Sequence, residues 1–352
     1  MNTRLLTIAI FASAAATAQT PEGLPCWRDL NLFTQGGETA RTELVFHSTR
    51  QEALNGSVRS SSCYLDLCGR WDFRYYDDSR DCPEGIFAEP EGWSSIRVPG
   101  NWEVQGFGTP IYVNTVYEFK RRDVTPPELP DPNPLGVYRH RFEVPASWQG
   151  RQIYLNFDGV KGGAQYYVNG TLVGYNNDSK DPIRFNVTKL LHAGTNEIGL
   201  KVYRWSTGSY LECMDFWRIS GIEREVYLST ESTDSGFDFE VVSTLAEDLH
   251  TGDFRLRLRS REPVSFSAEL LDPEGRTVAA FEPQRLDDSL ELSATLERVL
   301  PWSAETPNLY TLLMKVDEEW TRFRVGFRRF EITTIEQQGR TFPVFLVNGQ
   351  PV

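Results

Sequence analysis

The stretch Gly163–Tyr175, "GAQYYVNGTLVGY", decides the fold class of this 352-residue chain. It places Asn169 and Gly170 between two apolar arms. An Asn-Gly pair in that setting favours a tight turn in which both residues have positive φ. The stretch therefore predicts an antiparallel β-hairpin.

Other segments around this hairpin also have the character of strands, because they are short, rich in β-branched or aromatic residues and partly alternating. They are "VYRHRFEV" at Val137–Val144, "QIYLNFDGV" at Gln152–Val160 and "NEIGLKVYRW" at Asn196–Trp205. Helical periodicity is scarce, and strands joined by turns without helices indicate antiparallel sandwiches. The Pro-rich run Thr125–Gly136 lacks the backbone donors of a central strand and predicts a long surface loop.

A second set of strands begins after Thr230. From Ser235 to about Phe330 the chain contains new alternating runs separated by Asp, Glu, Pro and Gly. About seven strands in roughly a hundred residues are typical of an immunoglobulin-like sandwich. The last stretch, "FLVNGQPV" at Phe345–Val352, opens a further hairpin at an Asn-Gly turn and does not complete it.

Length and charge limit the classes of function. A chain of 352 residues predicts two or three domains, since single cores rarely grow beyond about 250 residues. The net charge of −13 and the pI near 4.9 argue against a nucleic-acid partner, which would require a basic surface to neutralise phosphates.

The N-terminus has the pattern of a secretory signal. An apolar run, Leu5–Ala16, follows Arg4, and the small-residue site Ala16–Ala18 precedes Gln19. A membrane anchor is disfavoured because the run is short and ends in Ala and Thr, and no later segment is apolar enough to span a bilayer. We expect an exported protein, secreted or periplasmic, that starts near Gln19.

Cysteine and histidine spacing predicts neither a zinc site nor a nucleophilic triad. The five cysteines are Cys26, Cys63, Cys68, Cys82 and Cys213, and the four histidines are His47, His140, His192 and His250. They form no C-x-x-C pair and no zinc-finger spacing. Cys63, Cys68 and Cys82 lie close enough in sequence to pair after export, but an odd total leaves at least one thiol without a partner in the same chain. Cys213 is interpreted as a small packing residue.

The stretch Arg204–Gly221, "RWSTGSYLECMDFWRISG", combines four aromatic rings with carboxylates and guanidinium groups. Aromatic faces stack on the apolar faces of sugars, while charged groups form directional hydrogen bonds to hydroxyls. The alternative is a sandwich corner with the Trp residues in the core and the charged residues paired at the surface. This segment alone leaves both interpretations open.

Several segments in the same order resemble the N-terminal region of glycoside hydrolase family 2 β-galactosidases. They are Val98–Phe119, Phe157–Leu191, Arg204–Leu228 and, for the second domain and its junction with a catalytic barrel, Trp302–Val316 and Arg324–Val352. The resemblance covers nearly the whole mature chain.

The resemblance implies an all-β fold in which a jelly-roll (galactose-binding-like) sandwich precedes an immunoglobulin-like β-sandwich. The expected parts are a signal peptide at 1–18, an N-terminal extended segment at 19–59, a jelly-roll sugar-binding domain at 60–231, an immunoglobulin-like domain at 232–331, and the start of a truncated (β/α)₈ barrel at 332–352. The family's acid/base and nucleophile are Glu residues on barrel strands. We therefore expect both to lie beyond Val352, with no catalytic residue in this chain and no activity of the chain alone.

Two residues correspond to the family's substrate contacts in the jelly-roll: Asn114 and Asp215. An ionised Asp accepts hydrogen bonds from sugar hydroxyls and can ligate a monovalent cation, and an amide both donates and accepts. Trp217 and Arg218 are interpreted as residues that hold the loop. Where the family commonly has Asp-Gln, this chain has Cys213-Met214. For the full enzyme the resemblance implies Mg²⁺ and Na⁺.

The sequence thus predicts the non-catalytic front region of an exported β-galactosidase that hydrolyses terminal non-reducing β-D-galactosides with retention. The expected partners are a β-galactoside or oligosaccharide substrate and, for the full enzyme, further copies of itself. One alternative is a stand-alone, lectin-like carbohydrate-binding protein, which the opened hairpin at Phe345–Val352 disfavours. Another is a β-glucuronidase or β-mannosidase of the same family.

Overall fold

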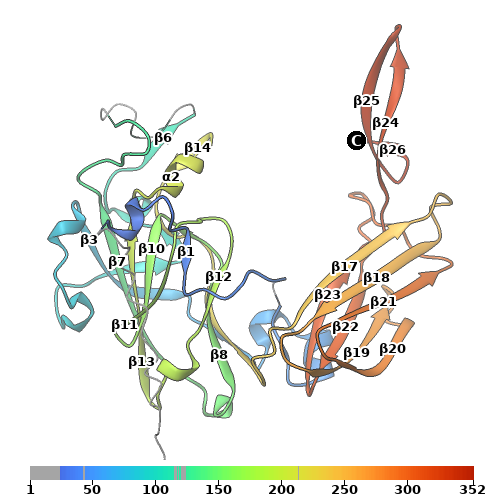
Figure 1. Cartoon of the computed structure of the whole chain (residues 1–352), viewed down its shortest axis with the longest axis horizontal. Helices are drawn as coiled ribbons and strands as arrows, with labels where there is room; N and C mark the ends of the chain where they lie inside the picture. The colour runs from blue at the N-terminus through green and yellow to red at the C-terminus, as the bar shows by residue number, and fades with distance from the viewer. Residues whose placement is uncertain (1–23, 43, 115–116, 118, 120–123, 213) are drawn as a thin grey trace, which may run out of the picture.

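The computed structural model describes residues 24–42, 44–114, 117, 119, 124–212 and 214–352. Two β-sandwiches lie side by side, and a hairpin extends from the second (Figure 1). The predicted all-β class is confirmed. In these ranges the α-helices are α1 (Arg50–Asn55) and α2 (Gly208–Leu211), and the 3₁₀ turns are Cys26–Arg28, Val58–Ser60, Ser79–Asp81, Ile86–Ala88, Glu103–Gln105, Ala146–Trp148 and Thr188–Leu190. No helix of the described residues has the length and apolar character needed to cross a membrane.

The first sandwich pairs a large sheet with a smaller one. The large sheet has the order β1 (Thr34–Gln35), β11 (Thr171–Asn176), β10 (Gly163–Val168), β13 (Thr195–Tyr203), β7 (Leu135–Glu143), β3 (Gly69–Tyr76) and β4 (Ser94–Val98). The smaller has the order β12 (Ile183–Asn186), β8 (Gln152–Phe157), β16 (Val226–Glu231) and β2 (Tyr64–Asp66). There are also two short sheets. One contains β5 (Gly100–Asn101), β15 (Gly221–Ile222) and β9 (Val160–Lys161). The other is a two-stranded ribbon of β14 (Phe216–Arg218) and β6 (Ile111–Val113).

The hairpin predicted at Gly163–Tyr175 is confirmed as β10 and β11. Asn169 and Gly170 have φ values of 48° and 76°, as the tight turn requires. The Asn169 side chain also accepts from the Glu197 backbone N–H at 2.8 Å and donates to the Leu190 carbonyl at 2.8 Å. The turn is therefore fixed to β13 as well as to its own strands.

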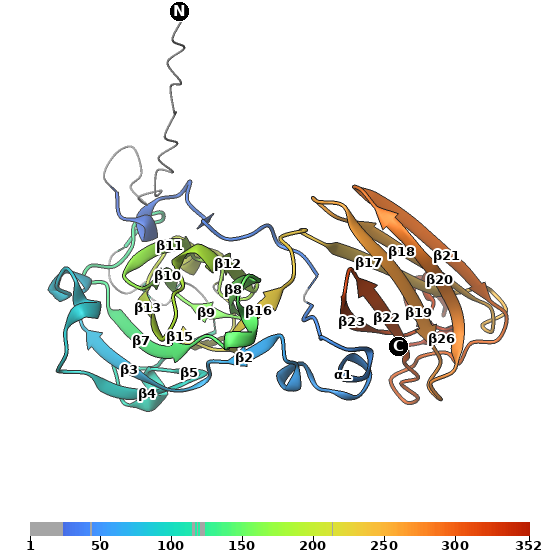
Figure 2. The ribbon, with the colours of Figure 1, turned by 90° about the horizontal axis from the view of Figure 1, so that it is seen from below.

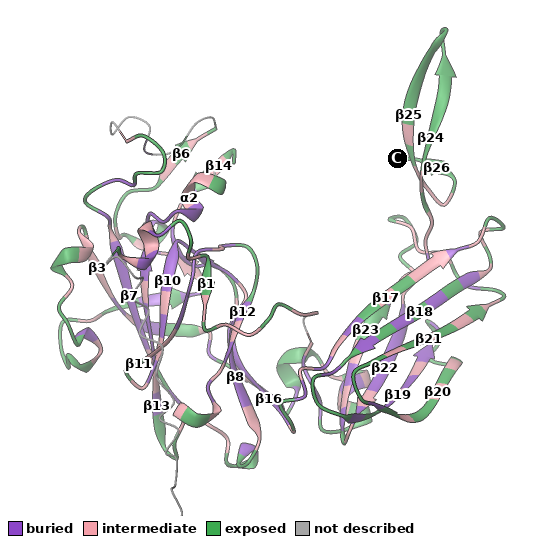
Figure 3. Cartoon of the chain, in the orientation of Figure 1, coloured by how far each residue is buried: buried purple, intermediate pink, exposed green. Residues whose placement is uncertain are grey.

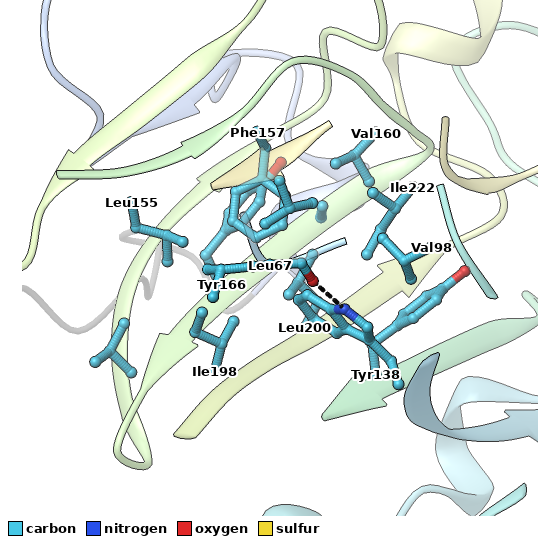
Figure 4. Packing of buried hydrophobic residues seen from close by; sticks show 14 of the residues in the cluster. Leu67, Val98, Tyr138, Leu155, Phe157, Val160, Tyr166, Ile198, Leu200 and Ile222 are labelled. Atoms are coloured by element: carbon cyan, nitrogen blue, oxygen red, sulfur yellow. Dashed lines mark hydrogen bonds between the residues drawn. The ribbon is translucent and has the colours of Figure 1, made fainter. Parts of the chain in front are cut away.

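Apolar side chains fill the space between the two sheets of the first sandwich (Figure 4). Leu155 and Phe157 come from β8, and Ile198 and Leu200 come from β13; all four are inaccessible to solvent. Burying such a side chain contributes about 1.5–3 kcal/mol. The loops that follow these strands are therefore supported by a well-packed core.

The second sandwich has the seven strands expected of an immunoglobulin-like domain. One sheet contains β17 (Asp238–Leu245), β18 (Gly252–Arg259) and β21 (Ser289–Leu296); the other contains β20 (Thr277–Leu286), β19 (Val264–Leu271), β22 (Tyr310–Val316) and β23 (Glu319–Val325). β18 alternates strictly, with Phe254, Leu256 and Leu258 buried and the arginines between them exposed. Figure 3 shows this alternation along the sheet.

The last three strands are β24 (Phe330–Gln337), β25 (Arg340–Val347) and β26 (Gln350–Pro351), and they form a hairpin to which a short third strand is added. It projects away from the second sandwich and is largely exposed (Figure 3). Several of its apolar side chains are exposed too, among them Phe330, Phe342 and Ile332, which reaches 79%. The Asn348-Gly349 turn joins β25 to β26, with φ values of 49° and 74°. The expectation that this hairpin is not completed is wrong, because Gln350 and Pro351 pair with Val347 and Leu346.

The N-terminal residues 24–42 and 44–61, here called the strap, run between the two sandwiches (Figure 2). Its strand β1 pairs with β11 of the first sandwich. Farther along, His47 exchanges backbone hydrogen bonds with Trp320 of the second sandwich, at 2.7 and 2.9 Å. Arg322 of β23 donates to the carbonyls of Leu54 and Gly56 at 2.6 and 2.8 Å. The chain then returns to the first sandwich at β2.

The four cysteines in the described ranges are unpaired thiols: Cys26, Cys63, Cys68 and Cys82. Burial raises the pKa of Cys26 to about 12 and also raises that of Cys63, so neither is a thiolate at neutral pH. Cys213, predicted to be a packing residue, lies outside the described residues. The Pro-rich segment forms a loop as predicted, but the loop ends at Pro134, because Leu135 and Gly136 already belong to β7.

Candidate functional site

The segment Arg204–Gly221 leaves the end of β13 and covers one end of the first sandwich. Its first residues are core, because Trp205 is only 1% exposed. The Asn133 side chain brackets the Trp205 backbone, donating to its carbonyl at 2.9 Å and accepting from its N–H at 3.0 Å. The segment therefore begins from a fixed position.

Arg204 joins this segment to the one that contains Glu103. Its guanidinium donates to the Thr109 carbonyl at 2.8 Å and to the Arg218 carbonyl at 3.3 Å, and it lies 3.7 Å from the Glu103 carboxylate. Glu103 also accepts from the Ser220 N–H at 2.7 Å. Burial raises the pKa of Glu103, while the Ser220 N–H and Arg204 oppose that rise. Charged groups therefore hold the Arg204–Gly221 segment against the segment that contains Glu103.

Glu212 fixes the middle of the segment to the sandwich. Its carboxylate forms an ion pair with Lys161 and accepts from both the backbone N–H and the hydroxyl of Ser179, at 2.7 Å each. Its backbone carbonyl accepts from Arg218 at 3.1 Å. Sequence reasoning gave Glu212 no role.

Beyond Glu212, β14 pairs with β6 to form an antiparallel ribbon. Trp217 lies opposite Tyr112, and Phe216 lies opposite Val113. Tyr112 and Trp217 are 53% and 55% exposed, whereas Phe216 and Val113 are half-buried and Arg218 is buried. Because side chains alternate between the faces of a strand, the ribbon has one outer face.

Asn114 and Asp215 flank the last pair of this ribbon, Val113 with Phe216, and both are exposed. Each lies one residue beyond the end of its strand and two residues from an outward-facing aromatic side chain. The Tyr112 hydroxyl donates to Asp215 Oδ1 at 2.8 Å, and this bond to a carboxylate raises the pKa of Tyr112. The structure therefore brings the two predicted site residues to the same end of one ribbon.

Two interpretations of single residues can be compared with this geometry. Arg218 is 3% exposed and holds the loop through Glu212, as expected. Trp217 is 55% exposed and lies against Tyr112 across the ribbon, and the structural role expected for it stays a prediction. The ring centroids of Trp217 and Tyr112 are 5.5 Å apart and the planes are inclined by 52°. Sequence reasoning missed Tyr112, although its spacing of two from Asn114 was a usable signal.

The outer face offers a carboxylate, an amide and two aromatic rings, a set suited to a ring with apolar faces and hydroxyl groups at its rim. For a metal ion the fit is partial. Asp215 and Asn114 carry oxygen donors of the kind that hard cations accept, but hard cations take about six. In the described part of the chain, no group of three or more His, Cys, Asp and Glu side chains is arranged to hold a metal.

Two family models match the chain. The glycosyl hydrolases family 2 sugar binding domain matches residues 65–232, and a second model of glycosyl hydrolases family 2 matches residues 237–328. Among curated relatives, the β-galactosidase of Halalkalibacterium halodurans is 36% identical over 320 residues, covering 87% of this chain and 31% of the relative. That of Priestia megaterium is 33% identical over 334 residues, covering 88% and 32%. The chain spans about a third of the length of these relatives.

Solved structures share the fold. A Bifidobacterium dentium β-glucuronidase complexed with coumarin-3-O-glucuronide gives a TM-score of 0.62 at 20% identity, covering 83% of this chain and 52% of that one. A Ruminococcus gnavus β-glucuronidase in complex with D-glucaro-δ-lactam gives 0.60 at 17% identity, covering 82% and 48%. At these identities the likeness concerns the fold alone.

Proposed function

Because the chain belongs to glycoside hydrolase family 2, we propose that it is the N-terminal, non-catalytic region of an exported β-galactosidase that hydrolyses terminal β-D-galactosides with retention. The observation that carries the proposal is the outer face of the β6–β14 ribbon, where Asn114 and Asp215 stand together. In this role Asp215 accepts a hydrogen bond from a sugar hydroxyl, and Asn114 adds a neutral contact.

These residues bind and orient the sugar but cannot cleave it. Retention requires two carboxylic acids about 5 Å apart on either side of the glycosidic bond, one as acid/base and the other as nucleophile. The described residues form two sandwiches and a hairpin, and the family resemblance assigns the catalytic pair to a barrel. We therefore expect the 352-residue chain alone to release no galactose from a chromogenic β-galactoside.

Two considerations favour a galactoside over a glucuronide. The two β-galactosidases described above are 36% and 33% identical to this chain, whereas the two β-glucuronidase structures are 20% and 17% identical. In addition, Asp215 would repel the carboxylate of a uronate, because like charges at short range disfavour binding.

Export, metal ions and assembly belong to the same proposal. Cleavage after Ala18 would yield a secreted or periplasmic protein that begins at Gln19, and residues 1–23 lie outside the described residues. The intact mass of the exported protein measures this directly, and retention of Met1–Ala18 would contradict it.

Asp215 would supply one ligand to Na⁺. The proposals of Mg²⁺ and of homo-oligomerisation rest on the family resemblance only.

Substitution of Asp215 tests the function. In the full-length product of the gene, Asp215→Ala should lower kcat/KM for a galactoside roughly ten- to a hundredfold, because a charge-assisted hydrogen bond contributes about 1.5–3 kcal/mol. Asn114→Ala should act in the same direction but more weakly, since its contact is neutral. The melting temperature should change little, because Asp215 is exposed.

Asp288→Ala is the matched control, because Asp288 is an exposed carboxylate on the second sandwich. It should leave both quantities unchanged. A destabilised but fully active Asp215→Ala enzyme would contradict the proposal and identify Asp215 as a structural residue.

A further inference from the structure

We infer that the outer face of the β6–β14 ribbon is a pyranose-stacking subsite in which Trp217 and Tyr112 cover the apolar face of the sugar ring. Within it, Tyr112 is also a positioning residue that holds the Asp215 carboxylate. The inference rests on the proposed function and extends it to two residues for which the family resemblance gave no sugar contact.

The exposure of Trp217 is the first reason. Trp71, Trp102 and Trp205 are at most 2% exposed, whereas Trp217 is 55% exposed, and Leu211 and Met214 of the same segment are exposed as well. Its cross-strand neighbour Tyr112 is exposed to nearly the same degree. A pair of large exposed rings is the usual mark of a binding surface.

The second reason is the geometry of the pair. The two rings are inclined by 52° and are not stacked flush on each other, so their outer faces remain open. The Tyr112 hydroxyl is bonded to Asp215 at 2.8 Å, which sets a fixed separation between the aromatic surface and the acceptor. A pyranose has an apolar C–H face and hydroxyls at its edge, so both contacts can be made by one ring.

The third reason is rigidity beneath the face. Arg218, the buried neighbour of Trp217 on β14, donates to the Glu212 carbonyl, and the Glu212 carboxylate is held by Lys161 and Ser179. A site whose side chains are fixed in advance loses little conformational entropy when the ligand binds. The support therefore suits a small ligand more than a surface that must rearrange.

The test measures binding of methyl β-D-galactopyranoside and methyl β-D-glucopyranoside to the 352-residue chain by saturation-transfer NMR. Trp217→Leu keeps an apolar side chain but loses the ring, and should weaken galactoside binding roughly three- to tenfold. Trp217→Phe should retain most of the affinity. Tyr112→Phe should weaken binding without lowering the melting temperature, and Tyr117→Phe, a nearby exposed tyrosine outside the ribbon, should change nothing.

A double-mutant cycle separates positioning from simple contact. If Tyr112 acts through Asp215, the effects of Tyr112→Phe and Asp215→Asn on galactoside affinity should be non-additive. Additive effects would overturn the positioning role.

The remaining outcomes distinguish this inference from the proposed function. If Asp215→Ala abolishes binding while Trp217→Leu leaves it intact, the stacking subsite is refuted and the proposed function stands. If the unaltered chain binds neither sugar, the subsite is again refuted, and galactoside hydrolysis by the full-length gene product still tests the proposed function independently. A Trp217→Leu variant that changes the sedimentation coefficient but not sugar affinity would mean that the face contacts another copy of the chain.

Discussion

Glu212 shows how much one side chain can determine at the candidate site. Its carboxylate meets the buried ammonium of Lys161 and two donors of Ser179, and Asp215 follows three residues later. Glu212→Ala should destabilise the chain by roughly 3 kcal/mol, because it leaves the Lys161 charge buried and unpaired. Urea unfolding measures this loss.

The exposed Glu297 supplies the control, and Glu297→Ala should change the free energy of unfolding by less than about 0.5 kcal/mol. Removing both charges, as in Lys161→Met with Glu212→Leu, should recover part of the lost stability, because no uncompensated charge remains. Equal losses for the single and double variants would argue against the ion pair as the cause.

At this scale the sequence predicted the residues that have a family counterpart and missed those defined by tertiary contact. Asn114 and Asp215 could be named from the resemblance, and their substrate role stays a prediction. Glu212 could not be assigned a role, because its partners Lys161 and Ser179 are 51 and 33 residues away. The exposure of Trp217 could not be predicted for a similar reason, since the face that it occupies depends on the pairing of β14 with β6.

Among the elements, the β10–β11 hairpin depends on a turn that few residues can form. Gly170 has a φ of 76° with open space around it, so Gly170→Ala should cost about 1 kcal/mol through backbone strain alone. Gly170→Asn should cost less, since Asn tolerates this conformation. Thermal unfolding of both variants checks the order, and an Ala variant at least as stable as the Asn variant would contradict it.

Short-range signals explain why some elements were predictable and others were not. The hairpin at Asn169-Gly170 and strands β7, β8 and β13 carry their pattern within ten residues. The β6–β14 ribbon does not, because its strands have three residues each and Tyr112 is 103 positions from Asp215. No window of sequence contains that pairing.

For the whole molecule, stability should depend on pH through the contact of the strap with the second sandwich. His47 is 2% exposed and its Nδ1 has no hydrogen-bond partner. Burial lowers the pKa of His47 below its ordinary 6.5, an effect that Arg322 reinforces and Glu52 opposes. The lowered pKa means that the folded state prefers neutral His47, so this stabilisation is present above pH 6.5 and is lost as pH falls toward the folded-state pKa.

Denaturant unfolding at pH 7.5, 6.5 and 5.5 measures this effect. The wild-type chain should lose more stability on acidification than His47→Gln, which cannot titrate. His250 is exposed, so His250→Gln should follow the wild-type curve. Parallel curves for wild type and His47→Gln would exclude His47 as the origin of the acid sensitivity.

The strap also has a mechanical consequence. The chain passes between the two sandwiches three times: from β1 to His47, from α1 back to β2, and from β16 to β17. A body held by one tether can swivel and a body held by two can swing about the line that joins them, but three separate tethers leave no free axis. The two sandwiches should therefore move as one rigid body. A protease cut in any single crossing would leave them joined by the other two.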